Sequence, residues 1–298
     1  MKAVILAGGE GARLRPLTCD RPKPMVPVMN VPVMEHIIAL LRKYNFKDIA
    51  VTLQYLPDQI RHYFRDGRDF GVSIEYYIED SPLGTAGSVK NAEAFLDETF
   101  LVISGDALTD FNLENIVEFH RRKQGIATIV LTRQETPLEY GVVITDETNR
   151  IVRFLEKPGW NEVFSDTVNT GIYVLEPRVF CFFDRGVKFD FSKDLFPLLM
   201  AKNESLYGFT SPGYWCDIGT ITQYRQAHKD ILDGRVKINL NKEKRDDGVW
   251  VGRGVKIERG ARVEGPVFLG DGCWVRKGAV VKDYTVLGNN TLVETDSS

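Results

Sequence analysis

The 298-residue sequence contains few of the residues that hold disulfide-rich or metal-centred folds together, with four cysteines and four histidines. The cysteines are far apart and form no Cys-x-x-Cys pair, so we expect neither a zinc site nor a disulfide framework. The histidines are equally scattered, and we interpret all four as structural or surface residues. Free thiols are the expected state of Cys19, Cys181, Cys216 and Cys273.

The sequence also lacks long apolar runs and a strong net charge. No segment has the length and apolarity of a membrane span, and no signal segment precedes the first apolar run at residues 2–6. A formal net charge of −3 argues against a sequence-blind nucleic-acid binder, which would carry a basic face. We therefore expect a cytoplasmic protein that binds neither membranes nor nucleic acid.

Up to about Leu240, short β-rich runs alternate with amphipathic helical stretches, which predicts an α/β fold with helices on both faces of a sheet. The length agrees with roughly two domains. Strands are predicted at residues 2–6, 48–53, 73–78, 100–104, 127–132 and 171–175, and helices at residues 33–44 and 113–123.

After a charged stretch at residues 242–247, aliphatic residues recur every six positions without a miss. This hexad predicts a parallel β-helix domain at residues 241–298, after a first domain at residues 1–240. The segment resembles the left-handed β-helix of hexapeptide-repeat proteins, although the spacing leaves the handedness open. The repeating residues are Val251, Ile257, Val263, Leu269, Val275, Val281, Leu287 and Val293.

This short coil needs an end cap or a neighbour, because only about two and a half turns are present. We expect either a homo-oligomer that packs through the coil or a natural protein that continues past Ser298. Many hexapeptide-repeat proteins are acyltransferases that use a histidine between subunits. No histidine follows His228, so a scaffold, interface or regulatory role is favoured over that chemistry.

The most informative segment follows the first predicted strand, where a glycine-rich turn meets four cations. Backbone N–H groups around such glycines can crowd an anion, and the cations add charge. A surface turn has no reason to gather four cations in so short a segment. The turn comprises Leu6, Ala7, Gly8, Gly9 and Gly11, and the cations are Arg13, Arg15, Arg21 and Lys23.

Two common phosphate-binding motifs are excluded here. Leu14 stands where a dinucleotide-binding Gly-x-Gly-x-x-Gly turn has its last glycine, and Pro16, Pro22 and Pro24 prevent a helix from following. The spacing of a Walker loop is also absent. The segment from Leu6 to Met25 instead resembles the signature loop of the nucleotide-sugar pyrophosphorylases, which are sugar-1-phosphate nucleotidyltransferases.

This resemblance implies a Rossmann-like mixed sheet and a reaction in which a sugar 1-phosphate displaces pyrophosphate from a nucleoside triphosphate. It implies that Arg13 contacts the triphosphate and that Lys23 neutralises phosphate oxygens, which makes both candidate catalytic residues. Arg15 and Arg21 match less specifically, and solvated charges at a loop edge are an equal alternative. The turn from Leu6 to Gly11 becomes part of the nucleotide-binding site.

Two aspartates are candidate ligands for Mg²⁺, a cation that prefers carboxylate oxygens. Asp106 follows the apolar run at residues 100–103, so it would emerge at the carboxyl end of a strand, where open α/β sheets bind ligands. Asp217 lies in Trp-Cys-Asp-Ile-Gly, and the family places its metal-binding aspartates at these two motifs. A role as a turn or helix-cap residue remains an alternative for Asp217.

The segment Pro82-Leu83-Gly84-Thr85-Ala86-Gly87 matches the family's base and ribose contact, although such turns are also common helix starts. On this resemblance Pro82, Gly84 and Thr85 are nucleotide-binding residues, and Glu79 lies near the base edge. A carboxylate can accept from both N1–H and the 2-amino group of guanine, a donor pair that uracil and adenine lack. Glu79 therefore favours GTP.

The sugar side resembles the family in three further motifs. Gly141 belongs to a Tyr-Gly element beneath the pyranose, and Glu156-Lys157-Pro158 matches the motif whose glutamate accepts sugar hydroxyls and whose lysine binds the sugar phosphate. Asn169 would add a polar contact to the same ring. Alone, a charged dipeptide such as Glu156-Lys157 is more often a solvated turn. The order and joint occurrence of the motifs favour the functional interpretation.

The overall pattern is most similar to the family members that use GTP and mannose 1-phosphate. Members that use a glucose phosphate with UTP, ATP or dTTP are the nearest alternative, because the base edge and the sugar 2-hydroxyl are read by few atoms. A catalytically silent regulatory subunit is a second alternative. It is disfavoured because Arg13, Lys23, Asp106 and Asp217 are all present.

Overall fold

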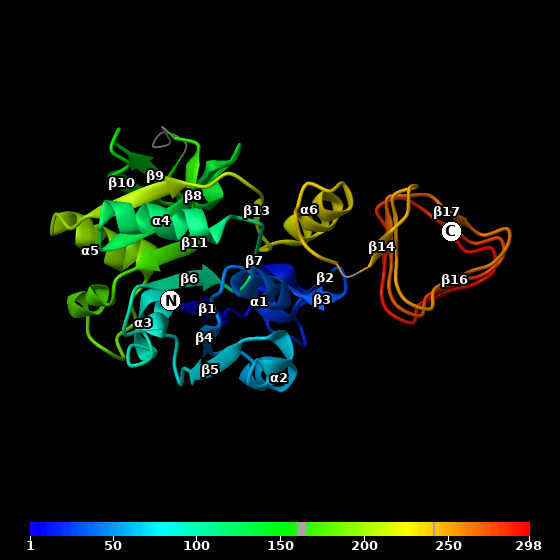
Figure 1. Ribbon diagram of the computed structural model, residues 1–298, viewed down its shortest axis with the longest axis horizontal. Helices are drawn as coiled ribbons and strands as arrows, with labels where there is room; N and C mark the ends of the chain where they lie inside the picture. The colour runs from blue at the N-terminus through cyan, green and yellow to red at the C-terminus, as the bar shows by residue number, and fades with distance from the viewer. Residues whose placement is uncertain (160–164, 241) are drawn as a thin grey trace. The chain divides into compact units, whose positions relative to one another are not determined.

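The structure is a computed structural model that describes residues 1–159, 165–240 and 242–298 (Figure 1). The chain divides into two compact units, Met1–Met25 with Val33–Asp217, and Val26–Pro32 with Ile218–Ser298. This division falls after Asp217, whereas the boundary expected from the sequence lies at residues 240/241. That boundary stays a prediction.

The first unit is built on a nine-stranded mixed sheet with the path β10-β9-β11-β6-β1-β4-β5, in which β8 pairs with β11 and with β12. The pairs of β1 with β4 and β6, of β4 with β5 and of β8 with β12 are parallel. The partners of β11 are antiparallel. The strands are β1 Lys2–Leu6, β4 Asp48–Leu53, β5 Ser73–Ile78, β6 Phe100–Ser104, β8 Ala127–Arg133, β9 Gly141–Thr145, β10 Ile151–Glu156, β11 Thr167–Leu175 and β12 Leu206–Thr210.

The predicted strands are confirmed, with one informative difference in β11. That strand begins at Thr167 rather than at Gly171. Its pairing with β8 shifts register between Asn169 and Tyr173, and Gly171 there has φ +74°. The glycine therefore marks a bulge inside a longer strand, which interrupts the apolar pattern without ending the strand.

Helices connect and cover these strands, as the alternation predicts. Within the first unit α3 packs against β1 and β4, α4 against β8, β11 and β12, and α5 against β10 and β12. The helix α4 starts at Asn112, whose side chain accepts the N–H groups of Glu114 and Asn115. The helices are α1 Val33–Lys43, α2 Pro57–Phe64, α3 Gly84–Asn91, α4 Leu113–Lys123 and α5 Phe196–Ala201.

A separate two-stranded sheet brings two distant parts of the sequence together. The strands β7 (Ala107–Thr109) and β13 (Trp215–Asp217) pair antiparallel, with Asp217 opposite Ala107. Since Asp106 directly precedes β7 and follows β6, this register sets Asp106 beside Asp217. The small sheet thus positions both predicted metal ligands.

The second unit begins with a hairpin and a helix. The strands β2 (Pro27–Val28) and β3 (Val31–Pro32) pair antiparallel, and α6 (Ile221–Leu232) packs against β2. The Thr220 hydroxyl caps α6 by accepting the N–H of Gln223. The helix is therefore a capped element that starts shortly after Asp217 in the chain.

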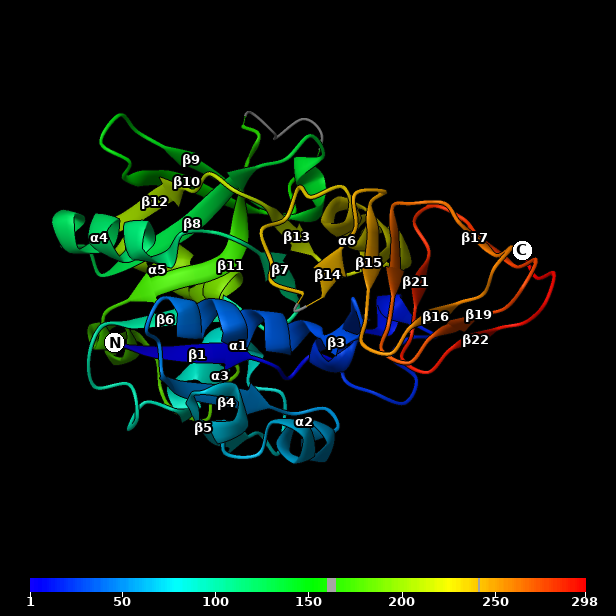
Figure 2. The ribbon, with the colours of Figure 1, turned by 45° about the vertical axis from the view of Figure 1, so that its right-hand side comes forward.

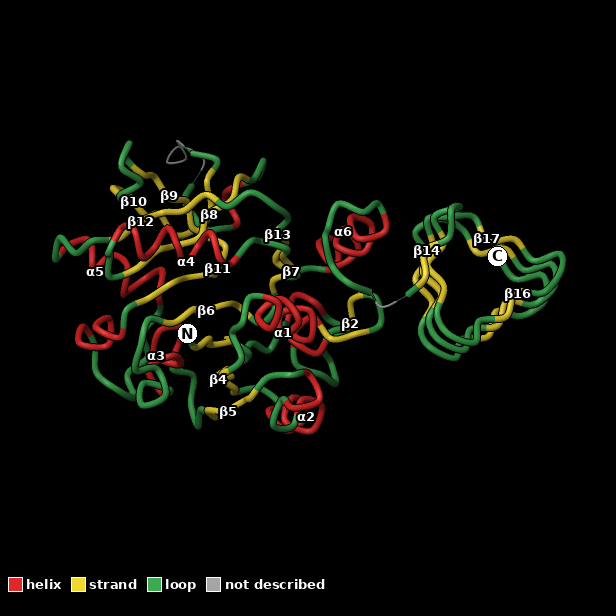
Figure 3. The backbone as a smooth tube through the Cα atoms, in the orientation of Figure 1, coloured by secondary structure: helices red, strands yellow, loops and turns green. Residues whose placement is uncertain are grey.

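The remainder of this unit is the hexad region, which we define as residues 249–293. It consists of short strands that pair in parallel with the strand 18 residues further along, such as Trp274 with Leu292 (Figures 2 and 3). Each of the eight predicted aliphatic positions ends one strand. The strands are β15 Val249–Val251, β16 Lys256–Ile257, β17 Arg262–Val263, β18 Val267–Leu269, β19 Trp274–Val275, β20 Val280–Val281, β21 Val286–Leu287 and β22 Leu292–Val293, with β14 (Glu243–Lys244) paired to β15.

Seven of the eight aliphatic positions belong to the apolar core of the hexad region, and Ile257 is the exception. Leu269, Val275 and Val281 are buried there, whereas Ile257 is 36% exposed. All four cysteines are free thiols, as expected. In the part of the chain that is described, no helix has the length and apolarity to cross a membrane.

Candidate active site

The glycine-rich turn follows β1 and is fastened to its surroundings by backbone geometry. Gly11 has φ +71°, and a Cβ at this position would lie 3.0 Å from the Lys23 Cβ. Its carbonyl accepts the Thr18 hydroxyl at 2.8 Å. A Cβ built on Gly9 meets no described atom within 4 Å. Glycine at position 11 is thus required by conformation, while Gly9 borders open space from which an anion can reach the backbone.

The four cations of the loop differ in their partners. Arg15 donates to Glu10 at 2.6 Å, and Arg21 pairs with the adjacent Asp20 at 3.1 Å. Arg13 is exposed and forms no ion pair with a described residue. Burial and the Asp106 charge raise the pKa of Asp217, and the Arg13 charge, after that of Lys23, opposes this rise. Arg13 is therefore the arginine of this loop with free charge near the aspartate pair.

Lys23, Asp106 and Asp217 form one cluster. The Lys23 ammonium donates to the Asp106 carboxylate and, at 3.1 Å, to Asp217 Oδ1. The Ser104 hydroxyl donates to the second Asp106 oxygen at 2.5 Å. The Lys23 side chain is 11% exposed. The structure thus brings together three predicted site residues that are distant in the sequence.

The pKa shifts in this cluster follow from burial and from the two facing carboxylates. Burial favours neutral Lys23, but the Asp106 and Asp217 carboxylates outweigh it and raise its pKa. Burial also opposes ionised Asp106, whose pKa is nevertheless lowered by Lys23. Burial and the Asp106 charge raise the pKa of Asp217. One lysine therefore shares its charge between two carboxylates and stabilises Asp106 most.

The same two carboxylates are suitable donors for a hard divalent cation. Among the described residues, no three His, Cys, Asp or Glu side chains cluster as metal ligands. Mg²⁺ needs only one or two carboxylates when substrate phosphates and water complete its shell. Two carboxylates face one ammonium, so this pair has more negative charge than Lys23 alone offsets.

The base turn is held by internal contacts. Glu79 is buried, and its carboxylate accepts the N–H of Leu83 at 3.0 Å. A Cβ on Gly84 or Gly87 would lie 2.6 Å from a carbonyl oxygen of the 187–189 segment. These glycines therefore permit close packing at the start of α3. The nucleotide contacts of Glu79, Pro82, Gly84 and Thr85 stay predictions.

The sugar motifs form a second cluster around Glu156, at the end of β10. Gly141 lies opposite Glu156 in the ladder, and a Cβ on Gly141 would approach Glu156 Oε2 to 2.9 Å. Burial and then the Asp190 charge raise the pKa of Glu156, against Lys157, Lys193 and a Ser192 hydrogen bond. Lys157 is exposed at φ +46°, an unusual conformation for a non-glycine residue.

Asn169 is fixed in this cluster by both ends of its amide. Its Nδ2 donates to the Tyr173 hydroxyl at 3.0 Å and to Ser192 Oγ at 3.2 Å, and its Oδ1 accepts the Gly171 N–H at 3.0 Å. The hydrogen bond from the Gly171 N–H to Asn169 Oδ1 spans two residues, and the bulge at Gly171 gives the backbone the turn that this bond needs. Asn169 therefore orients its neighbours as well as lining the cluster.

The sequence analysis missed Ser192, Asp190 and Tyr173. Asp190 caps the segment Phe191–Leu195 by accepting the N–H groups of Ser192 and Lys193, and it also accepts the Thr85 hydroxyl at 2.8 Å. It thereby joins the base turn to the sugar cluster. The available signal was the Asp-Phe-Ser run before an apolar helix, which has the composition of a helix N-cap.

Comparisons with known proteins agree with this arrangement. Residues 2–234 match the family described as nucleotidyl transferase. The chain is 37% identical to the UTP–glucose-1-phosphate uridylyltransferase of Synechocystis sp., over 98% of this chain and 84% of that protein. It is 32% identical to the mannose-1-phosphate guanylyltransferase of Mycobacterium tuberculosis, over 94% of this chain and 82% of that protein.

A solved structure has the same fold. The crystal structure of HddC from Yersinia pseudotuberculosis complexed with GMP-PN superposes with a TM-score of 0.67 at 26% identity, and it covers 77% of this chain and 99% of HddC. The family match spans the glycine-rich turn, the Lys23 cluster and the sugar cluster. The chain therefore belongs to the nucleotidyl transferase family and is one of its sugar-1-phosphate nucleotidyltransferases.

Proposed function

We propose that this nucleotidyltransferase uses GTP and mannose 1-phosphate and forms GDP-mannose and pyrophosphate. The observation that carries the reaction class is the Lys23–Asp106–Asp217 cluster beside the glycine-rich turn. Buried Glu79 at the base turn supports GTP, and the relative from Mycobacterium tuberculosis is a mannose-1-phosphate guanylyltransferase. The uridylyltransferase relative makes UTP with glucose 1-phosphate the alternative to test.

The transfer needs alignment and charge neutralisation rather than a covalent enzyme intermediate. A phosphate oxygen of the sugar phosphate attacks the α-phosphorus, a new P–O bond forms, and the bond from the α-phosphorus to the bridging β-oxygen breaks as pyrophosphate leaves. That oxygen is already an anion at neutral pH, so no general base is required. Lys23 and Arg13 hold phosphate oxygens and offset their charge, while Lys157 holds the sugar phosphate.

We propose Mg²⁺ as the resident metal, held by Asp106 and Asp217. The two carboxylates share a single ammonium, which supports a second positive charge at this position. When bound, the metal neutralises phosphate oxygens of the nucleotide. In the structure Lys23 forms ion pairs with the same two carboxylates. We expect metal binding to weaken these ion pairs, so that the Lys23 ammonium can interact with the substrate phosphates.

Pyrophosphate release across a matrix of GTP, UTP, ATP and dTTP with mannose 1-phosphate and glucose 1-phosphate tests the substrates. We expect the highest kcat/KM for GTP with mannose 1-phosphate. A higher value for another pair would overturn the substrate assignment and leave the reaction class intact. Absence of release from every pair would contradict the reaction class itself.

The role of Glu79 is tested by comparing GTP with ITP, which lacks the 2-amino group. We expect wild-type enzyme to prefer GTP by roughly 10-fold or more, as one charge-assisted hydrogen bond would provide. Glu79→Gln still offers an oxygen to the Leu83 N–H, so the turn survives while the GTP preference falls. An unchanged preference in this variant would remove Glu79 from base recognition.

We further propose that the hexad region is a left-handed parallel β-helix of hexapeptide repeats and that it supports a homo-oligomer. The 18-residue register of its parallel strands supports the repeat, and the exposed side chains of Trp274 and Leu292 support an interface. Light scattering of the full chain should give a multiple of 33.8 kDa, and Leu292→Glu should reduce it. A monomer in both would contradict the oligomer.

A further inference from the structure

A second hollow lies entirely within the second unit, outside the active site. Its volume is about 500 Å³, a size suited to a small ligand. The hairpin, α6 and the hexad region all contribute to its wall. The lining residues are Pro27, Asn30, Tyr224, Arg225, His228, Lys229, Tyr284 and Val286.

Hydrogen bonds between the three elements hold the hollow in shape. The Tyr224 hydroxyl of α6 donates to the Pro27 carbonyl at 2.9 Å, and Asn30 donates to the Leu287 carbonyl at 2.8 Å. The Tyr284 hydroxyl donates to Asp233, just after α6, at 2.9 Å. A ligand would therefore enter a site whose walls are already connected, which limits the entropy lost on binding.

The lining of this hollow contains two cations and no carboxylate. Arg225 and Lys229 lie one turn apart on α6, and neither forms an ion pair with a described residue. The nearby Asp233 and Asp230 carboxylates instead pair with Arg235, at 3.6 and 3.2 Å. The His228 ring lies between the Met29 N–H, 3.4 Å from Nε2, and the Tyr224 carbonyl, 2.9 Å from Nδ1. These charges favour an anion.

Tyr284 has a backbone conformation that is unusual for a tyrosine. Corners of the hexad region with positive φ recur at six-residue intervals, except at Pro266, and Tyr284 occupies one of them with φ +57°. A large side chain in this region is an outlier that points to a function. The other described corners with positive φ hold small or amide and carboxylate residues, namely Gly248, Gly254, Gly260, Gly272, Gly278, Asn290 and Asp296.

The Tyr284 ring borders the hollow next to the Lys229 ammonium. Lys229 Nζ lies 5.5 Å from the centre of the Tyr284 ring, and the Tyr284 side chain remains partly exposed. On α6, the Tyr224 and His228 rings contact each other edge to face at 4.4 Å. The hollow therefore combines aromatic surfaces with two cations, which is the chemistry that recognises a flat ring attached to a phosphate.

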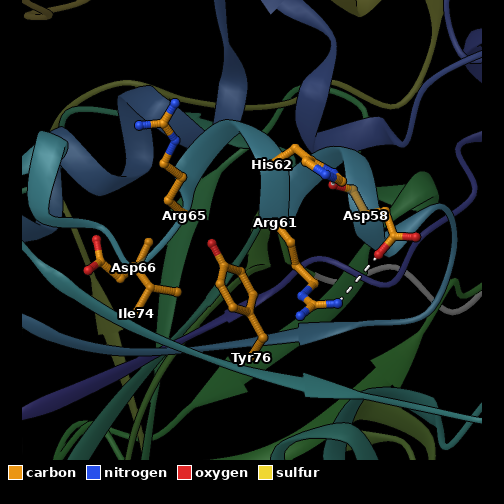
Figure 4. Close-up of a pocket in the computed structure, with 7 residues that line it drawn as sticks. All are labelled: Asp58, Arg61, His62, Arg65, Asp66, Ile74 and Tyr76. Atoms are coloured by element: carbon orange, nitrogen blue, oxygen red, sulfur yellow. Dashed lines mark hydrogen bonds and ion pairs between the residues drawn. The ribbon is translucent and has the colours of Figure 1, made fainter.

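A hollow on the first unit provides a contrast. It has about 480 Å³ and lies between α2 and β5, where Figure 4 shows Arg61 turned toward Asp58. Arg61 pairs with Asp58 at 3.4 Å and Arg65 with Asp69 at 3.6 Å. Because its cations face carboxylates, this hollow has no comparable preference for an anion. Volume and arginine content alone do not make a site.

We propose that the hollow of the second unit binds a nucleoside phosphate, with the base against Tyr284 and the phosphate on Arg225 and Lys229. The site regulates the enzyme through the chain itself. The hairpin at Pro27 follows Lys23 by four residues, and α6 begins four residues after Asp217. A ligand that tightens the hairpin against α6 therefore acts on both segments that carry the catalytic cluster.

Calorimetric titration of the full chain with ADP, GDP and UDP in separate arms tests the site, and inorganic pyrophosphate is the ring-free arm. We expect two sites per chain for at least one nucleotide in wild-type protein. Tyr284→Asn should retain one site, and so should Arg225→Ala combined with Lys229→Ala. Asparagine adopts the left-handed corner readily, so Tyr284→Asn should melt no lower than wild type. Arg61→Ala combined with Arg65→Ala is the matched charge control and should retain two sites.

Turnover measured at saturating substrates with and without the same nucleotide tests the regulation. We expect at least a twofold change in wild-type enzyme and none in Tyr284→Asn, whose turnover without added nucleotide should equal that of wild type. One site in wild type, two sites in Tyr284→Asn, or equal occupancy by pyrophosphate would overturn the proposed ligand. An unchanged wild-type turnover would overturn the regulation. None of these outcomes depends on which substrate pair the active site uses.

Discussion

The two ends of the active site handle charge in opposite ways. At the phosphate end, Lys23 lies between Asp106 and Asp217, and the ionised forms of Lys23 and Asp106 are stabilised, whereas burial and the Asp106 charge raise the pKa of Asp217. At the sugar end, Glu156 is half-buried near Asp190, and its ionised form is disfavoured. At the phosphate end a lysine is ion-paired with two carboxylates. At the sugar end the Glu156 carboxylate lies where burial and a second carboxylate disfavour its charge.

This difference matches what each end must bind. Phosphates are anions, so their site needs cations held in place by groups that a metal or substrate can displace. Sugar hydroxyls are neutral donors, so their site needs strong acceptors, and a carboxylate poorly satisfied by protein is the strongest acceptor available. Substitutions at the phosphate end should therefore lower the stability of the fold as well as activity. Substitutions at the sugar end should change only the affinity for the sugar phosphate.

Removing the cation of the phosphate end should have the largest effect. Lys23→Ala leaves two partly buried carboxylates face to face, so we expect about 3 kcal/mol of destabilisation together with a roughly 10²- to 10³-fold loss of kcat. Thermal unfolding and pyrophosphate release measure the two effects. Arg21→Ala, in the same loop but paired with exposed Asp20, is the control and should change stability by less than about 0.5 kcal/mol.

The corresponding change at the sugar end should separate affinity from stability. Glu156→Gln replaces a carboxylate by a weaker acceptor, so the KM for the sugar phosphate should rise roughly 10- to 100-fold. The stability should stay level or rise slightly, because the charge beside Asp190 is removed. The nucleotide KM is the internal control. Comparable losses of stability in Glu156→Gln and Lys23→Ala would remove the distinction between the two ends.

The pH dependence sharpens the same distinction. The pKa of Glu156 is raised from 4.5 by burial and then by Asp190, and its stabilising effect is present below pH 4.5 and lost as pH rises through the folded-state pKa. Affinity has the opposite sign, because only the carboxylate accepts two hydroxyls. The sugar-phosphate KM of wild type should therefore rise at low pH with a midpoint above 4.5. The substrate phosphate also titrates in this range. Glu156→Gln lacks the titrating carboxyl, so the pH dependence of its KM gives the contribution of the substrate phosphate alone.

Local patterns in the sequence were sufficient for most of the fold. Buried parallel strands are continuous apolar runs, so β1, β4 and β6 are predicted with their observed bounds. The bounds of β5, a largely exposed edge strand, are also predicted correctly. The hexad interval likewise locates every strand end from Val251 to Val293. The apolar runs and the six-residue interval both depend only on residues that are close in the sequence. They can therefore be recognised in one sequence without knowledge of the tertiary contacts.

The missing parts depend on contacts between distant segments. Ser192 and Asp190 approach Glu156 only because β10 and the segment after η6 (Pro177–Phe182) fold together, and no local period encodes that approach. The grouping of Val26–Pro32 with the C-terminal segment has the same origin. Gly84 is predicted to contact the nucleotide, and a glycine that packs against backbone has the same sequence signal. That contact stays a prediction.

The smallest effect should come from Gly141→Ala, which tests whether the position of Glu156 matters separately from its charge. The added methyl would lie 2.9 Å from both Glu156 Oε2 and the Phe154 ring, so the carboxylate must move while the ladder remains. We expect a roughly threefold to tenfold rise in sugar-phosphate KM and about 1 kcal/mol of destabilisation from the Phe154 shift. If the methyl acts through Glu156, Gly141→Ala should add little to KM in a Glu156→Ala background, whereas an independent steric block would add its full effect. The double-mutant cycle therefore shows whether the methyl acts by displacing the Glu156 carboxylate or by blocking the sugar directly. Only displacement of Glu156 agrees with a sugar end whose affinity depends on this one carboxylate.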